Sequence, residues 1–271
     1  MLRFLRGDDV DALVAAFNDT FSDYVVPFHL TAPQLREMCA RRGVVLELSP
    51  AIFAGDRMAA FTLNALGSWN GVQSAYDSGT GVVPAHRRLG LARQLLEASF
   101  PALRERGAEQ MILEVLEPNA RAAALYRSLG FEVTRKLDCW RYSGIAALDG
   151  EAREISIDEV PAEYADVVPS WQNSIDCLRR SGDDRRVMTI DGGWVIVHAA
   201  TGDLSQLAVD PARRRRGIGT RLLRHTAAVA GKSLRILNVD TRSDAVRNFL
   251  AAAGAERFIT QLEMARATLD A

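Results

Sequence analysis

Cysteine and long apolar runs are both scarce in this 271-residue sequence. The three cysteines (Cys39, Cys139 and Cys177) are scattered, odd in number, and without the short spacing of metal ligands. This pattern argues against a disulfide framework, so we expect inert thiols, no metal and a reduced, cytoplasmic setting. No apolar run is long enough to span a bilayer, and residues 1–9 lack the apolar core of a signal peptide, so we expect no membrane partner.

An excess of basic residues is also missing. Lysine and arginine total 33 against 34 aspartates and glutamates, which argues against a dedicated nucleic-acid binder. The run Arg213–Arg216 can be interpreted as a basic patch, but it belongs to a turn that has another explanation. Hydrophobic residues make up 48% of the chain, which is enough for packed cores, and its length suits two domains.

A turn that occurs twice is the most informative pattern. Residues 80–92 and 207–219 each combine a short apolar strand, a proline, a basic turn, small residues at alternate positions and an amphipathic helix. Three pairs of residues keep one spacing of 127 positions: Pro84 and Pro211, Arg87 and Arg214, Gly90 and Gly217. A helix start offers unpaired N–H groups to an anion, and small residues let a pyrophosphate approach them. The repeated turn therefore predicts binding of a phosphorylated ligand.

The duplication extends through both halves of the chain. Each turn is followed by a helix, a strand, a second helix and closing strands, and is preceded by a hairpin. The predicted helices and strands after the turns are residues 89–106, 111–115 and 120–129 in the first copy, and 218–230, 234–239 and 244–253 in the second. We place domains at 1–145 and 151–271, separated by a small, polar segment. The predicted fold class is α/β (α+β), with a mixed, mostly antiparallel central sheet in each domain and helices on both faces.

Two motifs of the first half together resemble a known family. The turn reads Arg87-x-x-Gly90-x-Ala92, and farther on Leu113-Glu114-Val115 is followed by Asn119-x-x-Ala122-x-x-x-Tyr126-x-x-x-Gly130-Phe131. Both are similar to signatures of the GNAT superfamily of acyl-CoA-dependent N-acetyltransferases. The resemblance covers nearly all of residues 1–142 and, less completely, 153–266.

The resemblance implies a tandem enzyme that uses acetyl-CoA as acyl donor and an amine as acceptor. A neutral amine would attack the thioester directly, so catalysis is mainly positioning and proton management. In the first copy the implied CoA-binding residues are Val82, Val83, Arg87, Arg88, Leu89, Gly90, Leu91, Ala92, Arg93, Asn119 and Tyr126. In the second copy they are Leu207, Val209, Arg214, Arg215, Arg216, Gly217, Ile218, Gly219 and Thr220.

The implied catalytic acid is Tyr126, which would protonate the departing thiolate. The other interpretation is a core aromatic on an apolar helix face. Asn119 is either a ligand contact, a helix N-cap or both. The general base is open between Asp77 and Glu114, and each has an ordinary structural interpretation as well. Water relays also make a missing base acceptable.

The residues that would bind the acceptor are the part of the site that the sequence defines least. Tyr24 and Trp69 are candidate substrate residues, and Pro169–Asn173 occupies a comparable place in the second half. Core packing explains these aromatic residues equally well. The acceptor itself stays open among small amines, aminoglycoside-like antibiotics, polyamines and peptide N-termini, as does a longer acyl-CoA donor.

The second copy keeps its turn but departs from the motif. Leu250, Ser243 and Ala255 stand where the first copy has Tyr126, Asn119 and Phe131, and leucine cannot donate a proton. We expect the first copy to catalyse and the second to bind acyl-CoA weakly or serve as a scaffold. The reverse division stays open, because mycothiol acetyltransferases are similar tandem proteins whose C-terminal half does the chemistry.

Two further alternatives follow. One is an acyl-CoA sensor or scaffold without turnover, favoured by Leu250 and opposed by Tyr126. The other, a dinucleotide-dependent oxidoreductase, lacks the Gly-x-Gly-x-x-Gly turn in both halves. The edge strands that close each domain leave two arrangements open, pairing within the chain or between two copies as a homodimer.

Overall fold

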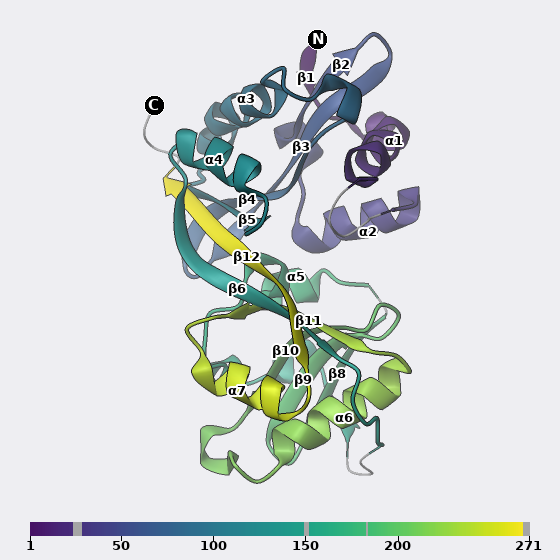
Figure 1. Cartoon of the computed structure of the whole chain (residues 1–271), viewed down its shortest axis with the longest axis vertical. Coiled ribbons are helices and arrows are strands. Elements are labelled where there is room, and N and C mark those ends of the chain that lie inside the picture. Colours follow the sequence, from purple (N-terminus) through teal and green to yellow (C-terminus); the bar gives the residue numbers. More distant parts are fainter. Residues whose placement is uncertain (24–28, 149–151, 183, 268–271) are drawn as a thin grey trace. The chain divides into compact units, whose positions relative to one another are not determined.

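The computed structural model describes residues 1–23, 29–148, 152–182 and 184–267, which form two compact units (Figure 1). Unit 1 contains Met1–Glu114, Asn119–Val133 and Met264–Ala271, and unit 2 contains Val115–Pro118 and Thr134–Glu263. Each unit is a mixed sheet flanked by helices, as the predicted fold class requires.

Unit 1 is built on five strands that lie in sequence order. They are β1 (Leu2–Phe4), β2 (Pro50–Ala54), β3 (Arg57–Trp69), β4 (Val72–Val82) and β5 (Gln110–Leu116). Neighbouring strands are antiparallel except β4 and β5, which are parallel. The helices are α1 (Val10–Phe21), α2 (Ala32–Arg42), α3 (Leu91–Glu105) and α4 (Ala120–Ser128).

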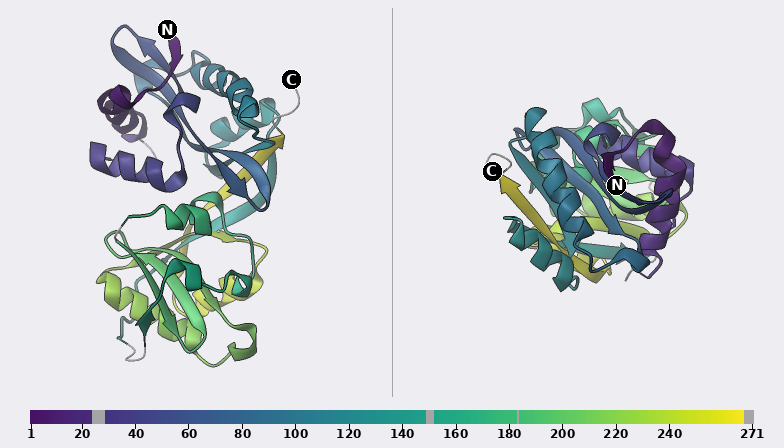
Figure 2. Two further views of the ribbon diagram at one scale, coloured as in Figure 1. Left: turned by 180° about the vertical axis from the view of Figure 1, so that it is seen from behind. Right: turned by 90° about the horizontal axis from the view of Figure 1, so that it is seen from above.

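The alternation of side chains along β3 explains how these helices divide between the two faces. Phe61 and Leu63 join the apolar cluster that packs under α1 and α2. Asn64 faces the other way, where its amide donates to Ser99 Oγ of α3 over 2.8 Å. Figure 2 shows α1 and α2 on one face of the sheet and α3 on the other.

Unit 2 repeats this plan with shorter elements. Its strands are β6 (Glu132–Tyr142), β7 (Arg153–Glu154), β8 (Arg185–Ile190), β9 (Gly193–His198), β10 (Asp203–Val209), β11 (Leu234–Asp240) and β12 (Glu256–Ala267). Their spatial order is β12-β6-β11-β10-β9-β8-β7, and β10 and β11 are parallel. The helices are α5 (Ile175–Arg179), α6 (Ile218–Ala230) and α7 (Asp244–Ala252). Leu222, Leu223 and Ile236 belong to its apolar core.

The closing strands give the compact units different boundaries from the predicted domains 1–145 and 151–271. From Thr134 onward β6 belongs to unit 2, where it pairs antiparallel with β11 from Leu234↔Tyr142 to Asp240↔Leu137. The last residues of β12 belong to unit 1, where Arg266 donates to the Leu129 carbonyl over 2.9 Å. The first copy thus supplies most of β6 to unit 2, whereas the second copy keeps most of β12 in unit 2 and contributes only its end, from Met264 onward, to unit 1.

A buried cluster of charged side chains links β6 to β11 and β12 within unit 2. The guanidinium of Arg135, 3% exposed, bonds both oxygens of Glu263 at 2.9 and 2.7 Å and Asp240 at 3.0 Å. The Asp240 carboxylate also accepts from Arg242. Burial raises the pKa of Asp240, but hydrogen bonds from Arg242 and Arg135 outweigh it and hold the value at about 2. Asp240 is thus ionised, and both acids are paired with the Arg135 guanidinium.

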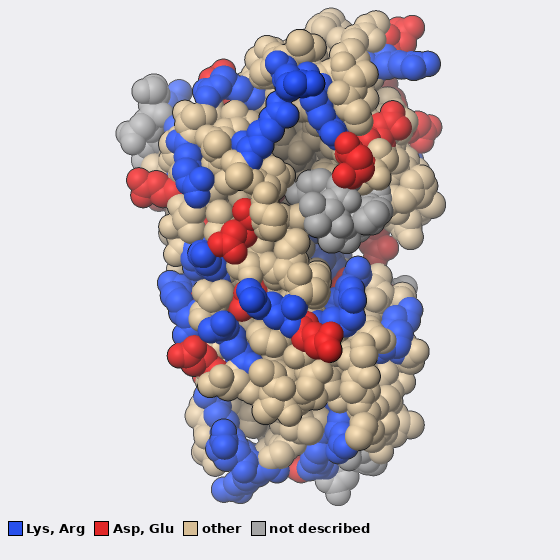
Figure 3. Space-filling model, in the orientation of Figure 1, with Lys and Arg blue, Asp and Glu red and all other residues tan. Residues whose placement is uncertain are grey.

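Within the described ranges no helix has both the length and the apolar character needed to cross a membrane. The same residues contain no group of three or more metal-binding side chains. Figure 3 shows basic and acidic side chains interspersed over both units, in line with the net charge of −1.

Candidate functional site

The two repeated turns, residues 80–92 and 207–219, which we call the phosphate turns after their predicted ligand, have the same backbone conformation. Arg88 and Gly90 have φ values of 67° and 74°, and their counterparts Arg215 and Gly217 have 63° and 79°. Helices α3 and α6 begin immediately afterwards, so the N–H groups of their first turns have no intrahelical acceptor. Successive backbone N–H groups in such a turn before a helix start form a concave anion site. A non-glycine residue held at positive φ twice, at matched positions, indicates a conformation under constraint.

The arginines that lead the two turns hold the backbone rather than extend toward a ligand. Arg87 donates through Nε to the Val82 carbonyl (3.2 Å) and through Nη2 to the Thr20 carbonyl (3.0 Å), and it pairs with Asp23 at 2.6 Å. The hydrogen bond with Asp23 raises the pKa of Arg87.

The same set of bonds recurs in unit 2. Arg214 donates to the carbonyls of Val209 (3.1 Å) and Tyr164 (3.1 Å) and pairs with Asp166 at 2.7 Å. The sequence carried a signal for these partners, since Asp23 and Asp166 both stand shortly before Val-Val-Pro.

Each unit also opens its sheet between the two parallel strands. The β4–β5 ladder ends at Asp77↔Leu113, although β4 continues to Val82 and β5 to Leu116. The β10–β11 ladder likewise ends at Leu204↔Ile236. A register shift in the hairpin leaves Ser78 as the extra residue in β4 and Ser205 in β10, again 127 positions apart. A bulge changes the direction of the neighbouring side chains and ends strand pairing. The parallel strands therefore separate at the same position in both units.

The opening in unit 1 brings Tyr126 and Asp77 together. The Tyr126 hydroxyl hydrogen-bonds to the Asp77 carboxyl, which also accepts from the Gly79 N–H (2.9 Å) and from Thr80 Oγ1 (2.7 Å). Both side chains are buried, at 8% and 6% exposure. Burial raises the pKa of Asp77 to about 6, although these three hydrogen bonds act in the opposite direction. The pair therefore combines a hydroxyl donor with a carboxyl that titrates near neutral pH.

Glu114, the other candidate base, has a different environment. Its carboxylate accepts a short hydrogen bond from the Tyr76 hydroxyl. Burial, and then the nearby carboxylate, raises the pKa of Tyr76 well above its ordinary value, so this phenol stays protonated. Close by, Arg42 donates to the backbone carbonyl of the bulge residue Ser78 over 2.9 Å. Glu114 thus has a hydroxyl partner of its own, distinct from that of Asp77.

Asn119 and Arg93 have structural partners at the ends of α4. Asn119 is the N-cap of this helix, and its Oδ1 accepts from the Ala122 N–H over 3.2 Å. Arg93 donates to Glu97 (3.2 Å) and to Ser128 Oγ (2.5 Å). The capping interpretation of Asn119 is confirmed.

Trp69, one of the two predicted substrate residues, lies away from this opening. Trp69 lies at the β3–β4 hairpin end, where it pairs with Val72. Five residues separate Val72 from Asp77 along β4, which corresponds to roughly 17 Å of strand. Tyr24 lies outside the described residues.

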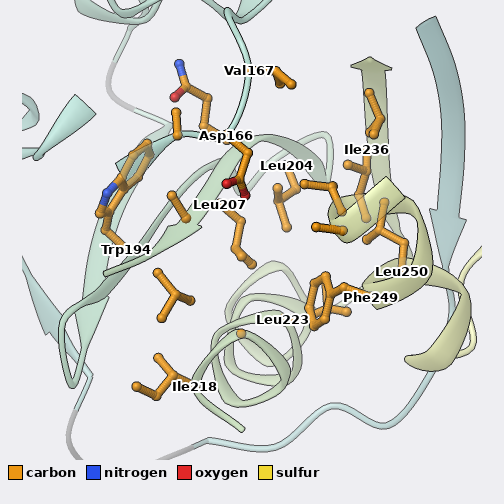
Figure 4. A pocket seen from close by; sticks show the side chains of 18 of the residues that line it. Asp166, Val167, Trp194, Leu204, Leu207, Ile218, Leu223, Ile236, Phe249 and Leu250 are labelled. Atoms are coloured by element: carbon orange, nitrogen blue, oxygen red, sulfur yellow. The ribbon is translucent and has the colours of Figure 1, made fainter. Parts of the chain in front are cut away.

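Unit 2 has a cavity of about 690 Å³ at the corresponding place, between β10, β11, α6 and α7. Leu204, Leu207 and Leu250 line it at the positions of Asp77, Thr80 and Tyr126. Figure 4 shows these side chains around one space with Ile236 and Phe249. The turn residues Arg213–Arg215 and Gly217–Thr220 line the same cavity. The cavity is thus continuous with the second turn, and these leucines share its lining with polar residues such as Asn173 and Gln206.

Asn173 bridges the opened strands of unit 2, a feature that the sequence did not reveal. Its amide donates to the Leu237 carbonyl of β11 over 2.9 Å, and its own carbonyl accepts from the Gln206 side chain of β10. Asn173 belongs to the short 3₁₀ helix Trp171–Asn173, which is buried throughout. One inner end of the cavity is therefore closed by a residue that bonds both strands.

Comparison with known families finds two matches in the chain. The model described as "Acetyltransferase (GNAT) family" matches residues 15–131, and the model described as "Acetyltransferase (GNAT) domain" matches residues 182–256. The two matched segments contain the two phosphate turns.

Among curated proteins, the [ribosomal protein bS18]-alanine N-acetyltransferase of Salmonella typhimurium is 41% identical over 88 residues, covering 31% of this chain and 54% of that protein. Streptothricin acetyltransferase of Streptomyces lavendulae is 36% identical over 101 residues, covering 37% and 51%. The chain thus spans about half the length of these curated relatives. A solved tandem GNAT protein from the clavulanic acid biosynthesis pathway, without AcCoA, matches over 100% of both chains with a TM-score of 0.65 and 17% identity, which is a likeness of fold.

Proposed function

The chain belongs to the acetyltransferase (GNAT) family and carries two copies of its domain, and from this premise we propose that unit 1 is an acetyl-CoA-dependent N-acetyltransferase. The observation that carries the proposal is the buried Tyr126–Asp77 hydrogen bond at the opening between β4 and β5. It joins a proton donor and a proton acceptor beside the start of a phosphate-binding helix.

The donor's phosphates bind at the first turn. Backbone N–H groups from Leu89 to Arg93 receive the pyrophosphate, and Arg88 adds positive charge at the helix start. The side chain of Arg87 contributes indirectly, because its bonds to Val82 and Asp23 keep the turn in shape. The pantetheine arm lies along Val82 and Val83, where β4 has left β5.

Proton transfer is assigned to the buried pair. A neutral amine attacks the thioester carbonyl carbon, so that the C–N bond forms and the C–S bond breaks. Asp77 accepts the amine proton and Tyr126 gives its proton to the departing thiolate. Because the two side chains are hydrogen-bonded, the proton on Asp77 can restore Tyr126. A base whose pKa lies near 6 is ionised at neutral pH, yet is basic enough to accept a proton.

Asp77 is preferred to Glu114 because of its partner. Glu114 is bonded to Tyr76, a phenol that burial keeps protonated. We therefore assign Glu114 a role in positioning the acceptor side of β5, through Tyr76, rather than a proton-transfer role.

The acceptor class follows from chemistry more than from shape. One curated relative is named for a protein alanine and the other for the small molecule streptothricin. An amine of a peptide or of a small molecule fits both, and we propose this class without a narrower choice.

The test is release of free CoA from acetyl-CoA over a panel of amines that includes an alanine-terminated peptide and a polyamine. Turnover with any amine, lost in Tyr126→Phe, supports the proposal. No turnover across the panel, together with no calorimetric binding of acetyl-CoA, would reject it. Turnover that survives in Tyr126→Phe and Asp77→Asn but disappears in Gly217→Asp would assign the chemistry to unit 2 instead.

A further inference from the structure

We propose that unit 2 binds an acyl-CoA whose linear acyl chain is several carbons longer than acetyl, and that it holds this thioester without transferring the acyl group. The proposal rests on the proposed CoA site at the second turn and is independent of turnover in unit 1. It is carried by the cavity of about 690 Å³ and by what lines it.

The cavity lining favours a chain of methylenes over an acetyl group. At three facing positions the polar residues of unit 1, Asp77, Thr80 and Tyr126, are replaced by leucines. The replacements are Leu204, Leu207 and Leu250, and Figure 4 shows them together with Ile236, Phe249 and Leu223. Polar groups that would penalise a buried chain are thus absent at these three positions, while Asn173, Ser205 and Gln206 line other parts of the cavity, whose size is that of a small-molecule site.

The mouth of the same cavity suits the phosphates of CoA. Arg215 and Gly217 hold the turn in the positive-φ conformation that the first copy also has. Arg213, Arg214 and Arg215 all line the cavity, and Asp166, the acid at this edge, is paired with Arg214 at 2.7 Å. One continuous site can therefore bind the anionic head group at the turn and the apolar acyl chain inside the cavity.

Two features argue that the bound thioester is not used. Leucine at positions 204 and 250 can neither accept the amine proton nor protonate a thiolate. Asn173 also joins β10 to β11 through Gln206 and Leu237, on one inner side of the cavity. An amine that approached between the strands from this side would have to break these part-buried hydrogen bonds.

The test is a chain-length series on the full-length protein. The first turn is silenced by Gly90→Asp, and acetyl-, butanoyl-, hexanoyl- and octanoyl-CoA are titrated calorimetrically. We expect one site whose Kd falls about fourfold per added methylene until the cavity is full. Leu250→Tyr should weaken octanoyl-CoA by about tenfold by placing a hydroxyl in the lining, whereas the volume-conserving Leu250→Met should keep the series.

Several results would overturn the proposal. One is a Kd that does not change with chain length, and another is octanoyl-CoA binding that survives in Gly217→Asp. Release of free CoA from octanoyl-CoA by the Gly90→Asp protein with an amine present would show transfer and overturn the second half.

The series stays readable if Gly90→Asp does not fold. Gly217→Asp is then compared with Gly217→Asn in the otherwise natural chain, since both residues tolerate positive φ and differ in charge. Octanoyl-CoA binding retained only in the asparagine variant supports the site, and equal binding in both rejects it. Because no amine is needed, failure of the acetyltransferase assay leaves this reading intact.

Discussion

Units 1 and 2 share the same turn and strand geometry, but they differ in the side chains that lie at these positions. Both have the matched positive-φ turn, the arginine that braces it, and the bulge at which the parallel strands part. At that opening unit 1 places a hydrogen-bonded acid and hydroxyl, whereas unit 2 places leucines around a cavity. In the functions that we propose, binding a phosphorylated ligand depends on backbone geometry and reacting with it depends on a few side chains, so the two are separable.

The largest expected effect comes from removing the Tyr126 hydroxyl, which unit 2 lacks because Leu250 occupies the matching position. Tyr126→Phe should lower kcat by about 10²–10⁴-fold, because the thiolate loses its proton donor. The measurement is CoA release at saturating acetyl-CoA. Tyr142→Phe is the control, since this hydroxyl donates to the Ile145 carbonyl in unit 2. Equal losses in both variants would point to a general effect on folding rather than to catalysis.

Asp77→Asn is expected to lower kcat/KM by about a hundredfold at pH 8 and by less at low pH. Asp77 accepts a proton only when ionised, and its pKa is about 6, so its contribution rises as the pH rises through 6. The quantity to plot is the ratio of wild-type to variant kcat/KM from pH 5 to 8, in which ionisation of the amine cancels. A ratio that is flat with pH would remove Asp77 from the role of base.

The turn that both units share is tested by substituting its glycine with either a charged or a neutral residue of similar size. Gly90→Asp should raise the KM for acetyl-CoA about 3–30-fold over Gly90→Asn, because a carboxylate at the helix start repels the pyrophosphate. The second-turn pair, Gly217→Asp and Gly217→Asn, should differ less in this assay. A larger difference at Gly217 than at Gly90 would reverse the assignment of the two units.

The smallest expected effect concerns the helix starts after the openings. Asn119 caps α4 with a side-chain hydrogen bond, whereas Ser243 at the start of α7 makes no such bond. Asn119→Ala should therefore lower the free energy of unfolding by about 1 kcal/mol, and Ser243→Ala by a few tenths. Urea denaturation of both variants measures the difference, and equal losses would show that the cap is not what distinguishes the two positions.

Much of the site followed from residues close together in the chain. Gly90 and Gly217 predicted the two turns because glycine readily takes the positive φ found there, and Asn119 predicted a helix start. Tyr126 and Asp77 were both named as candidates, but their hydrogen bond was not predicted. This miss concerns a contact made across the sheet, where register and bulges decide which side chains meet.

The sequence by itself determined the fold class, the duplication and the two phosphate turns, because each depends on periodicity, glycine placement and helix starts within a few residues. Only the tertiary structure decided that Asp77 is the partner of Tyr126, that Asn173 bonds both opened strands, and that β6 pairs with β11 in unit 2. Such contacts join segments far apart in the chain, and their free energy depends on burial and strand pairing that no local pattern encodes.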